Sequence, residues 1–376
     1  MKPIIYLIAI SIFASCTQVD KQQKASLPIA RSIKIQPADS QQVYIEDIAD
    51  SIRYITLQTN KDFSFRFITN FIITGKNILV CDRTQNKIFI FSKEGVPERM
   101  IVHSPITDML YDEDSGEIQI LDISMNRIFR FDTNGQFKGD LAVAGISYLG
   151  LSLAKNKNMY VCEMISNKNN TSMARLSTFN KEEESINYVN QQLNYPPIIQ
   201  DLNILYPHKF DNYKDSLFYF PLLDNKIYHV AATHSSPVYE LELPKENSIG
   251  DQLKAEHPAK DNFEYWRKMK EYNTIFENNS LFINDSWVFF RYCFQTIQQT
   301  RNVFFSKKTG KVIQFTGYAS RINKNFHIKS PVIGKTGNFF VVAIPPEKSR
   351  IKPASKQGPA SEPRPIKLML FTLKNS

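Results

Sequence analysis

The chain is poor in cysteine and glycine, and it lacks the short motifs that mark most enzymes. Its 376 residues include 4 Cys, 13 Gly and 6 His. There is no CxxC pair and no Cys/His cluster, so a structural zinc site is not expected. The histidines show no HxH or HExxH spacing, and neither a G-x-S-x-G elbow nor a phosphate-binding Gly loop is present. We therefore expect no metal and no cofactor, and the sequence gives little support for catalysis.

The charge pattern argues against nucleic acid as a partner. The formal net charge is +9, but the basic residues do not form a stripe interleaved with aromatic side chains. Such a stripe is what nucleic-acid-binding surfaces need to neutralise phosphates and stack bases. The excess of Lys and Arg is typical of a scattered, solvated surface.

The N-terminus resembles a bacterial lipoprotein signal. Lys2 precedes an apolar run, Ile4 to Phe13, that is too short to span a bilayer core of about 30 Å. The segment Phe13-Ala14-Ser15-Cys16 resembles a lipobox, whose Cys is acylated after cleavage. We expect a signal peptide over 1–16, a flexible polar tether over 17–40, and outer-membrane anchoring through lipid on Cys16. An ordinary signal peptide with an incidental Cys is the alternative.

Three further cysteines remain, an odd number that argues against a complete disulfide framework in an exported protein. Cys81 and Cys162 each precede an acidic residue, where a second copy of the same pattern has Leu121. This equivalence predicts that both are small, buried core residues.

Self-similarity is the strongest signal in the chain. Residues 78–95 read ILVCDRTQNKIFIFSKEG and residues 118–135 read IQILDISMNRIFRFDTNG. The acidic residue that closes the first apolar run recurs at Asp82, Asp122 and Glu163, with intervals of 40 (122 − 82) and 41 (163 − 122). Later copies start at 216, 286 and 338. A repeat of this length is typical of β-propeller blades.

The spacing within each unit predicts antiparallel hairpins. Only residues 83–86 separate the two apolar runs of the first unit, and a parallel crossover needs a dozen or more. The runs are continuously apolar, so both faces of each sheet should be buried, as in radially stacked blades. We expect an all-β, six-bladed β-propeller over 41–376. The sixth unit lacks a fourth strand, so residues 51–57 (SIRYITL) should close the last blade beside 366–373.

The run IEDIADSIRYITLQT (45–59) and the two repeat cores resemble the six-bladed β-propeller lipoproteins of Bacteroidetes, an NHL/TolB-like group of mostly unknown function. The resemblance is strongest over 45–140. It implies a secreted, lipid-anchored domain. The stretch VHSPITD (102–108) departs from the Gly-Pro-Glu-like turn that such proteins often carry there, so a ligand contact built on that turn is not implied.

Three insertions, 189–203, 243–272 and 345–365, fall in connections that we expect on one face of the propeller. Function concentrates on such loops, which makes this the expected working surface. Asp261 and Glu264 have capping-box spacing, so 243–272 should contain one short helix. Its aromatic and basic side chains could stack on sugars or bind an anion, although pinning the helix to the propeller is the simpler interpretation. The candidate ligand-binding residues are Tyr265, Trp266, Arg267, Arg291, Tyr292 and His208.

The recurring acids have a simple structural interpretation. Asp before a turn commonly caps its own backbone, and we expect this of Asp82, Asp122 and Glu163 rather than cation binding. Taken together, the sequence favours a non-enzymatic binding or scaffold module for an envelope glycan or protein partner. The alternative is a polysaccharide lyase or hydrolase with its site at the channel mouth. The sequence does not indicate the ligand or the oligomeric state.

Overall fold

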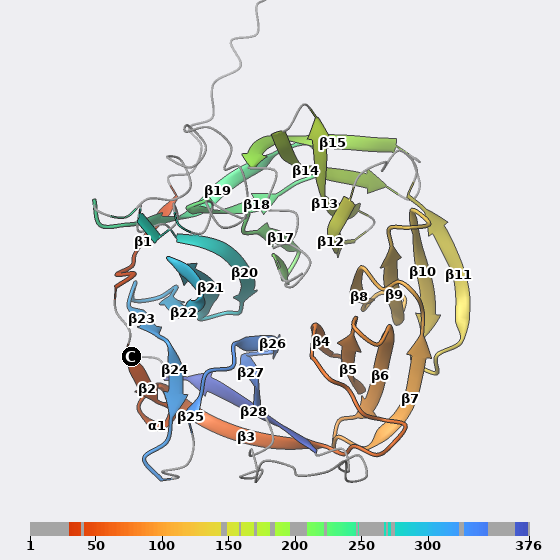
Figure 1. Cartoon of the computed structure of the whole chain (residues 1–376), viewed down its shortest axis with the longest axis horizontal. Helices are drawn as coiled ribbons and strands as arrows, with labels where there is room; N and C mark the ends of the chain where they lie inside the picture. Colours follow the sequence, from red (N-terminus) through yellow and green to blue (C-terminus); the bar gives the residue numbers. More distant parts are fainter. Residues whose placement is uncertain are drawn as a thin grey trace, which may run out of the picture.

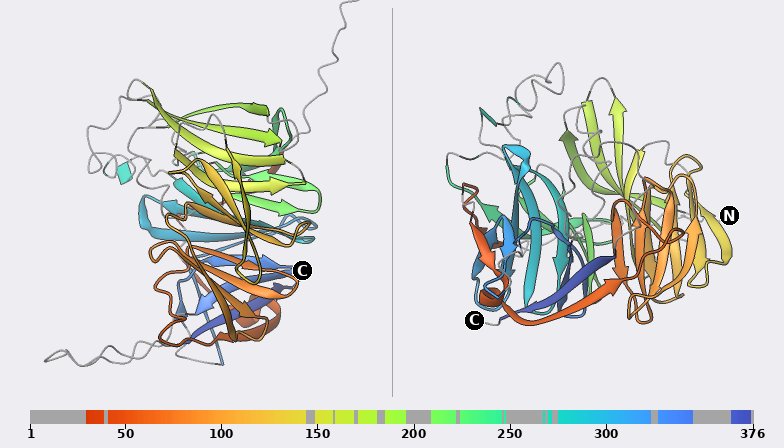
Figure 2. Two further views of the ribbon diagram at one scale, coloured as in Figure 1. Left: turned by 90° about the vertical axis from the view of Figure 1, so that its right-hand side faces the viewer. Right: turned by 60° about the horizontal axis from the view of Figure 1, so that its bottom comes forward.

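The computed structural model describes residues 30–38, 41–143, 149–157, 159–168, 171–180, 185–195, 209–221, 224–245, 247, 267, 270–271, 275–322, 327–344 and 365–374. These residues are almost entirely β-strand. Four- and five-stranded sheets follow one another around a ring (Figure 1), and the side views show them stacked face to face around it (Figure 2). The expected all-β propeller arrangement is confirmed.

The first two sheets are the repeat units recognised in the sequence. The first contains β4 (Asn70–Ile73), β5 (Asn77–Asp82), β6 (Lys87–Ser92) and β7 (Pro97–Val102), all antiparallel. The second contains β8 (Asp108–Asp112), β9 (Glu117–Asp122), β10 (Arg127–Asp132) and β11 (Phe137–Ala142). Every residue of β5 is buried, as its continuous apolar run predicts.

The next three sheets repeat the same antiparallel order from the channel outward. They contain β12 (Leu149–Asn156), β13 (Met159–Lys168), β14 (Thr171–Asn180) and β15 (Ser185–Tyr195); β16 (Phe210–Tyr213), β17 (Ser216–Tyr219), β18 (Lys226–Val230) and β19 (Ser235–Glu242); and β20 (Ile275–Ile283), β21 (Trp287–Phe294), β22 (Thr296–Ser306) and β23 (Val312–Phe315).

The two ends of the chain meet in one sheet. It is built from β26 (Val332–Thr336), β27 (Phe339–Ile344), β28 (Ile366–Leu373) and, outermost, β3 (Ala49–Leu57). The register runs antiparallel from Ile366 opposite Leu57 to Leu373 opposite Ala49. The predicted pairing of 51–57 with 366–373 is therefore present, and it leaves no open edge on β28.

Two additions were not expected. Strand β1 (Arg31–Lys34) pairs in parallel with β19, and Ile33 and Ile35 are buried. This part of the predicted tether 17–40 therefore belongs to the folded domain, because its alternating apolar residues extend a sheet. In addition, β2 (Gln42–Tyr44), β24 (Gly317–Ala319) and β25 (His327–Ile328) form a small sheet next to the one-turn helix α1 (Ile45–Ile48).

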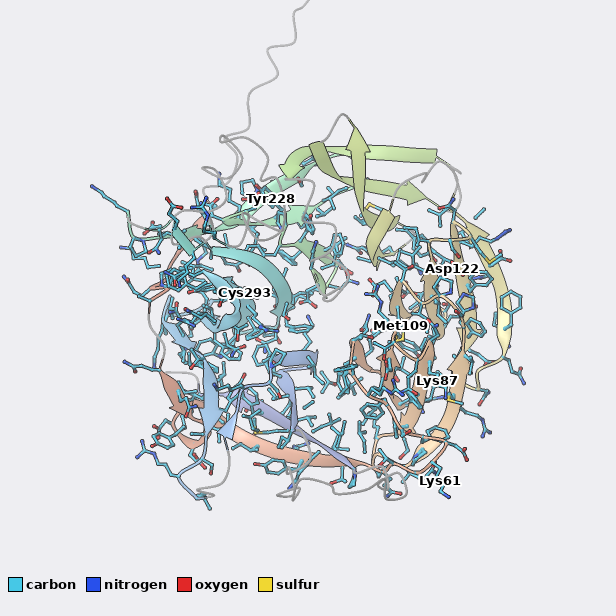
Figure 3. All side chains as sticks on the ribbon, in the orientation of Figure 1. Lys61, Lys87, Met109, Asp122, Tyr228 and Cys293 are labelled. Carbon is cyan, nitrogen blue, oxygen red and sulfur yellow. The ribbon has the colours of Figure 1, made fainter. Side chains whose placement is uncertain are left out.

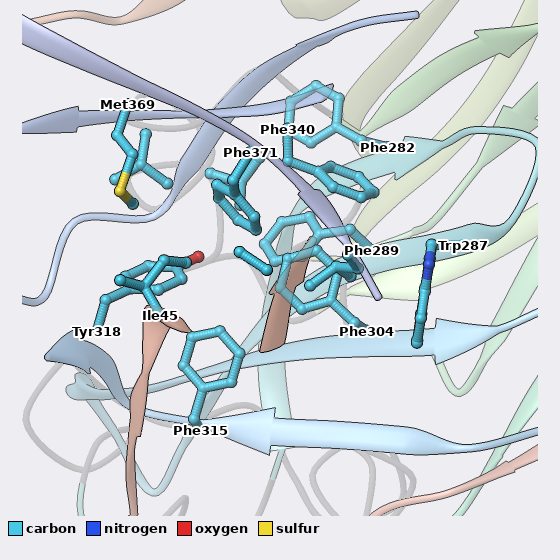
Figure 4. Close-up of a cluster of buried hydrophobic side chains, with 14 of the residues drawn as sticks. Ile45, Phe282, Trp287, Phe289, Phe304, Phe315, Tyr318, Phe340, Met369 and Phe371 are labelled. Atoms are coloured by element: carbon cyan, nitrogen blue, oxygen red, sulfur yellow. The ribbon is translucent and has the colours of Figure 1, made fainter. Parts of the chain in front are cut away.

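Aromatic side chains fill the space between adjacent sheets. The Phe304 ring lies 4.9 Å from Phe340 in the neighbouring sheet and 4.8 Å from Phe289 in its own (Figure 4). All three are fully buried. This explains the abundance of Phe in the sequence, because each large side chain buries 150 Å² or more between blades.

The repeated turn has a conformational reason for its Asn. Asn86 and Asn126 adopt φ values of 55° and 51°, in the left-handed region that Asn tolerates better than most residues. Gly95 and Gly135, in the next turn of each unit, also have positive φ. The Asn and Gly residues that the two units share therefore mark turns with the same positive-φ positions.

The recurring acids act as caps, as expected. One carboxylate oxygen of the fully buried Asp82 accepts hydrogen bonds from the Thr84 backbone at 3.0 Å and the Thr84 hydroxyl at 2.6 Å. The other accepts the backbone N–H of Arg66 at 2.6 Å, which ties in the connection from the previous sheet. Asp122 likewise accepts Ser124 Oγ at 2.6 Å. The side chain of Glu163 lies outside the described residues.

We predict that oxidation will link Ser51 and Thr372 when both are replaced by Cys. Their hydroxyl oxygens are 2.9 Å apart across β3 and β28. The bridge should raise the free energy of unfolding by up to about 5 kcal/mol, because it closes a very long loop in the unfolded chain. Non-reducing electrophoresis and denaturant unfolding would measure it, with S51C alone as the control. Absence of the crosslink would contradict this closure.

We also predict that Asp82→Ala will destabilise the protein by about 3 kcal/mol, because it leaves several buried donors without an acceptor. Asp132→Ala, at a more exposed turn capped in the same way, should cost about 1 kcal/mol or less. Burial raises the pKa of Asp82, but hydrogen bonds from Thr84, Gln85 and Arg66 outweigh it and hold the pKa below its usual value. The difference between wild type and D82A should therefore be complete at pH 7 and shrink as the pH falls below about 4. Urea unfolding at several pH values would test it; an undiminished difference at pH 3 would contradict it.

Candidate functional site

The innermost strands of the ring surround a cavity of about 550 Å³. Strands β4, β8, β12, β16, β20 and β26 all contribute to its wall. Met109, labelled in Figure 3, belongs to the inner strand β8, and its side chain is buried in the core beside that strand. The turns after β8, β12 and β16 form part of its mouth. Its charged and amide-bearing residues are Asn70, Asp108, Asp112, Glu113, Asp114, Lys155, Asn156, Lys157, Asp211, Asn212, Lys214, Asp215 and Lys335.

Asp108 joins three neighbouring inner strands. It is 3% exposed and accepts the backbone N–H of Leu153 in β12 at 2.8 Å. Its other oxygen accepts Asn70 Nδ2 from β4 at 3.0 Å and its neighbour's backbone N–H at 2.8 Å. Burial raises the pKa of Asp108 to about 6, although these donors oppose the shift. Both oxygens of the Asp108 carboxyl group therefore already accept hydrogen bonds from the inner strands.

Asp211 plays a similar part on the other side of the channel. Its Oδ2 accepts hydrogen bonds from the backbone N–H of Ile283 in β20, at 2.5 Å, and from Nζ of Lys335 in β26, at 2.6 Å. The same ammonium donates to the carbonyls of Asn212 at 2.8 Å and Ile283 at 2.5 Å. Burial raises the pKa of Asp211 to about 6, and the attraction of Lys335 opposes that rise. Three inner strands are again held by one buried acid.

Further polar contacts connect the remaining neighbours on this side. Asp112 in β8 forms an ion pair with Lys155 in β12. Burial raises the pKa of Asp112, but hydrogen bonds from Lys155 and Ser115 outweigh it and lower the pKa overall. Between β12 and β16, Asn212 Nδ2 donates to the Lys155 carbonyl at 2.7 Å. The acids of the wall thus hold the ring together before any ligand is considered.

The predicted ligand-binding residues lie elsewhere or outside the described residues. Tyr265, Trp266 and His208 are outside them. Arg267 is exposed and helical, as are Lys270 and Glu271, and it pairs with Glu271 at 3.5 Å. The helix predicted within 243–272 is thus described only at residues 267, 270 and 271. In the described part of the chain, α1 (Ile45–Ile48) is the helix for which both ends are defined.

Arg291 and Tyr292 are on β21, the second strand of its sheet, and neither lines the cavity. Tyr292 is fully buried in the core, where its hydroxyl contacts Gln314 Oε1 at 3.2 Å. Arg291 is 8% exposed. The structure therefore does not bring these two residues together with the charged wall of the channel.

The sequence did not single out the charged residues of the cavity. They come from short inner strands such as DMLYD and FDNY, at positions that differ between units. The available signal was an acid embedded among apolar residues in the strand before each repeat core. Within the described residues, no group of three or more His, Cys, Asp and Glu side chains is placed to hold a metal.

Solved structures of two Bacteroides proteins resemble this chain in fold. A Bacteroides fragilis protein described as exported superposes with a TM-score of 0.61 at 11% identity, over 83% of this chain and 88% of its own. A DUF4221 family member from Bacteroides vulgatus gives a TM-score of 0.49 at 9% identity, covering 87% and 97%. At these identities the likeness concerns the fold and not the ligand. No curated protein sequence matches the chain.

A family model covers nearly the whole chain. The model described as "Domain of unknown function (DUF4934)" matches residues 30–369, which include β1 and all but the last residues of β28. The match begins at the first residue that the structure describes. The chain therefore belongs to the DUF4934 family.

Proposed function

We propose that this protein is an exported, lipid-anchored propeller that binds a hydrophilic envelope partner, a glycan or a segment of another protein, at the mouth of its channel. The observation that carries the proposal is the cavity of about 550 Å³, whose wall combines carboxylates, ammonium groups and amides from successive inner strands. A concave site of this size with convergent polar groups suits a small polar ligand or the end of a chain.

The state of the wall favours binding over catalysis. Asp108 and Asp211, two buried acids of the cavity, already accept backbone N–H groups of neighbouring strands. A general acid or base needs a carboxyl that can reach substrate. Groups nearer the rim, such as Glu113 and Asp114, are exposed and suited to ligand contact.

A specific observation supports the enzyme as a second candidate. The pKa values of Asp108 and Asp211 are both raised to about 6, into the range that suits proton transfer near neutral pH. Both acids line the same cavity. A polysaccharide lyase or hydrolase would use such a pair, provided that substrate displaces their present hydrogen-bond donors.

The proposed ring has six blades, which is supported by the six inner strands that line the cavity. Export and anchoring are supported by the Phe13-Ala14-Ser15-Cys16 segment and by the description of the B. fragilis relative as exported. Within the described residues, no helix has the length and apolar character needed to cross a membrane. Binding through the face that bears 243–272, with Tyr265, Trp266 and Arg267, remains a prediction.

We predict that the double variant E113A/D114A will weaken binding of an envelope glycan fragment at least tenfold, because it removes two carboxylates that lie exposed at the cavity and can accept hydrogen bonds from sugar hydroxyls. Asp50→Ala, which removes an exposed acid on the outer strand β3, is the matched control. A glycan array would select the ligand and calorimetry would measure its affinity. Equal affinities of E113A/D114A and D50A would contradict a site in the channel.

The same ligand separates the two candidate functions. Incubation with wild type should leave a binding partner intact. Shortening of the polysaccharide that is abolished by Asp108→Asn in a folded variant would establish the enzyme instead.

We predict that Cys16→Ser will move the protein from the membrane to the soluble fraction of its native host. A lipid chain contributes about 0.8 kcal/mol per buried CH₂, so its loss removes the anchor. Metabolic labelling with an alkyne fatty acid should mark wild type and not C16S. Cys81→Ser, which replaces a buried core cysteine, should keep both the label and the location. Label retained by C16S would contradict the assignment.

A further inference from the structure

Three lysine ammonium groups gather around one aromatic ring at the edge of the cavity. Tyr213 is the last residue of β16. Nζ of Lys307 lies 3.9 Å from the centre of its ring, Nζ of Lys214 lies 5.0 Å away and Nζ of Lys335 lies 5.9 Å away. The three lysines come from the turns after β22 and β16 and from β26, so three different sheets converge there.

Nearby carboxylates neutralise only part of this charge. Asp285 accepts the Tyr213 hydroxyl at 2.7 Å and pairs with Lys214 at 3.3 Å. Lys335 donates to Asp211 and to two backbone carbonyls, so its hydrogen-bonding capacity is filled. Arg31 adds a fourth cation, whose guanidinium donates to the Lys307 carbonyl at 2.7 Å.

Among the described residues, the balance around the ring is therefore four cations against the two carboxylates of Asp211 and Asp285. The next carboxylate along the mouth, Asp215, is 3.7 Å from the ammonium of Lys157 and is already paired. Like charges held this close repel one another unless an anion lies between them.

Lys307 is the least neutralised member of the cluster. It is partly buried and donates to the Asn284 carbonyl at 2.8 Å, and no carboxylate of the described residues forms a salt bridge with it. Burial lowers its pKa; Asp285 opposes this, and Lys214, Lys335 and Arg31 add to the lowering. An amine in this position gains from a bound anion, because the anion compensates both burial and repulsion.

We infer that this cluster, Tyr213 with Lys214, Lys307 and Lys335, is an anion site that recognises an oxyanion substituent (sulfate, phosphate or carboxylate) on the ligand of the channel. The inference rests on the proposed function, since Lys214 and Lys335 line the same cavity. The anion site narrows the proposed ligand class from hydrophilic molecules in general to acidic ones. Lys307 and Lys214 supply the contacts, and Lys335, whose donors are occupied, contributes charge and positions Asp211.

The site can be tested in the native protein by competitive acetylation of lysines, read by mass spectrometry. Lys307 should react faster at pH 8 than the exposed Lys138, because a lowered pKa leaves more free amine. Sodium sulfate, exchanged for chloride at constant ionic strength, should slow acetylation of Lys307 at least threefold and leave Lys138 unchanged. Equal effects of sulfate on both lysines would overturn the inference.

A variant assay identifies the substituent and separates the two proposals. Lys307→Gln should reduce affinity for the sulfated, phosphorylated or uronate form of the bound glycan at least tenfold and leave its neutral form unaffected. Lys34→Gln, an exposed lysine on β1, is the control. Equal affinity of wild type for neutral and acidic forms would overturn the anion site while the binding function stands. If sulfate protects Lys307 but the protein binds no glycan, the anion site stands and the proposed binding function is overturned.

Discussion

The pairing of β3 with β28 is the contact on which the ring depends. The two strands come from opposite ends of the chain and share a register of eight residue pairs from Leu57 to Ala49. Without β3, β28 would expose a row of unpaired backbone groups, and the sheets on either side would lose a fixed neighbour. Gly95 lies against this seam: a Cβ there would be 2.2 Å from the Thr56 carbonyl oxygen, and its φ is 84°. The need for glycine at position 95 in the first repeat unit therefore depends on the strand pairing that closes the ring.

The closed ring was predictable because short, local sequence patterns specify its strands and turns. The repeated pattern of an acid, a turn and an Asn corresponds to a repeated turn in the structure. In the first unit Asp82 caps this turn and Asn86 adopts a positive φ. The sixth unit contained too few strands, and 51–57 was an unassigned strand of matching length. Pairing β1 with β19 could not be predicted in the same way, since four residues at the edge of a polar stretch carry no repeat signal.

The channel wall was not predictable for a different reason. The bridge from Asp108 to Leu153 joins residues 45 positions apart through a backbone N–H, so the partner's side chain carries no information. Asp211 performs the same task from a different strand position, because Asp108 is the first residue of β8 and pairs with Leu121, whereas Asp211 is the second residue of β16 and pairs with Phe218. The lysines around Tyr213 likewise come from three sheets and meet only when the ring closes.

Two kinds of buried acid give the ring opposite responses to pH. The pKa values of Asp82 and Asp112 are lowered, so their contribution is complete above about pH 4 and is lost on acidification. The pKa values of Asp108 and Asp211 are raised to about 6, so the folded state binds protons that the unfolded chain releases near pH 4. Ionisation of this second pair therefore opposes folding at neutral pH, and other interactions of the fold must offset it. A cationic cluster beside Asp211 reduces that cost, which gives the lysines a structural role as well as the proposed role in binding an anion.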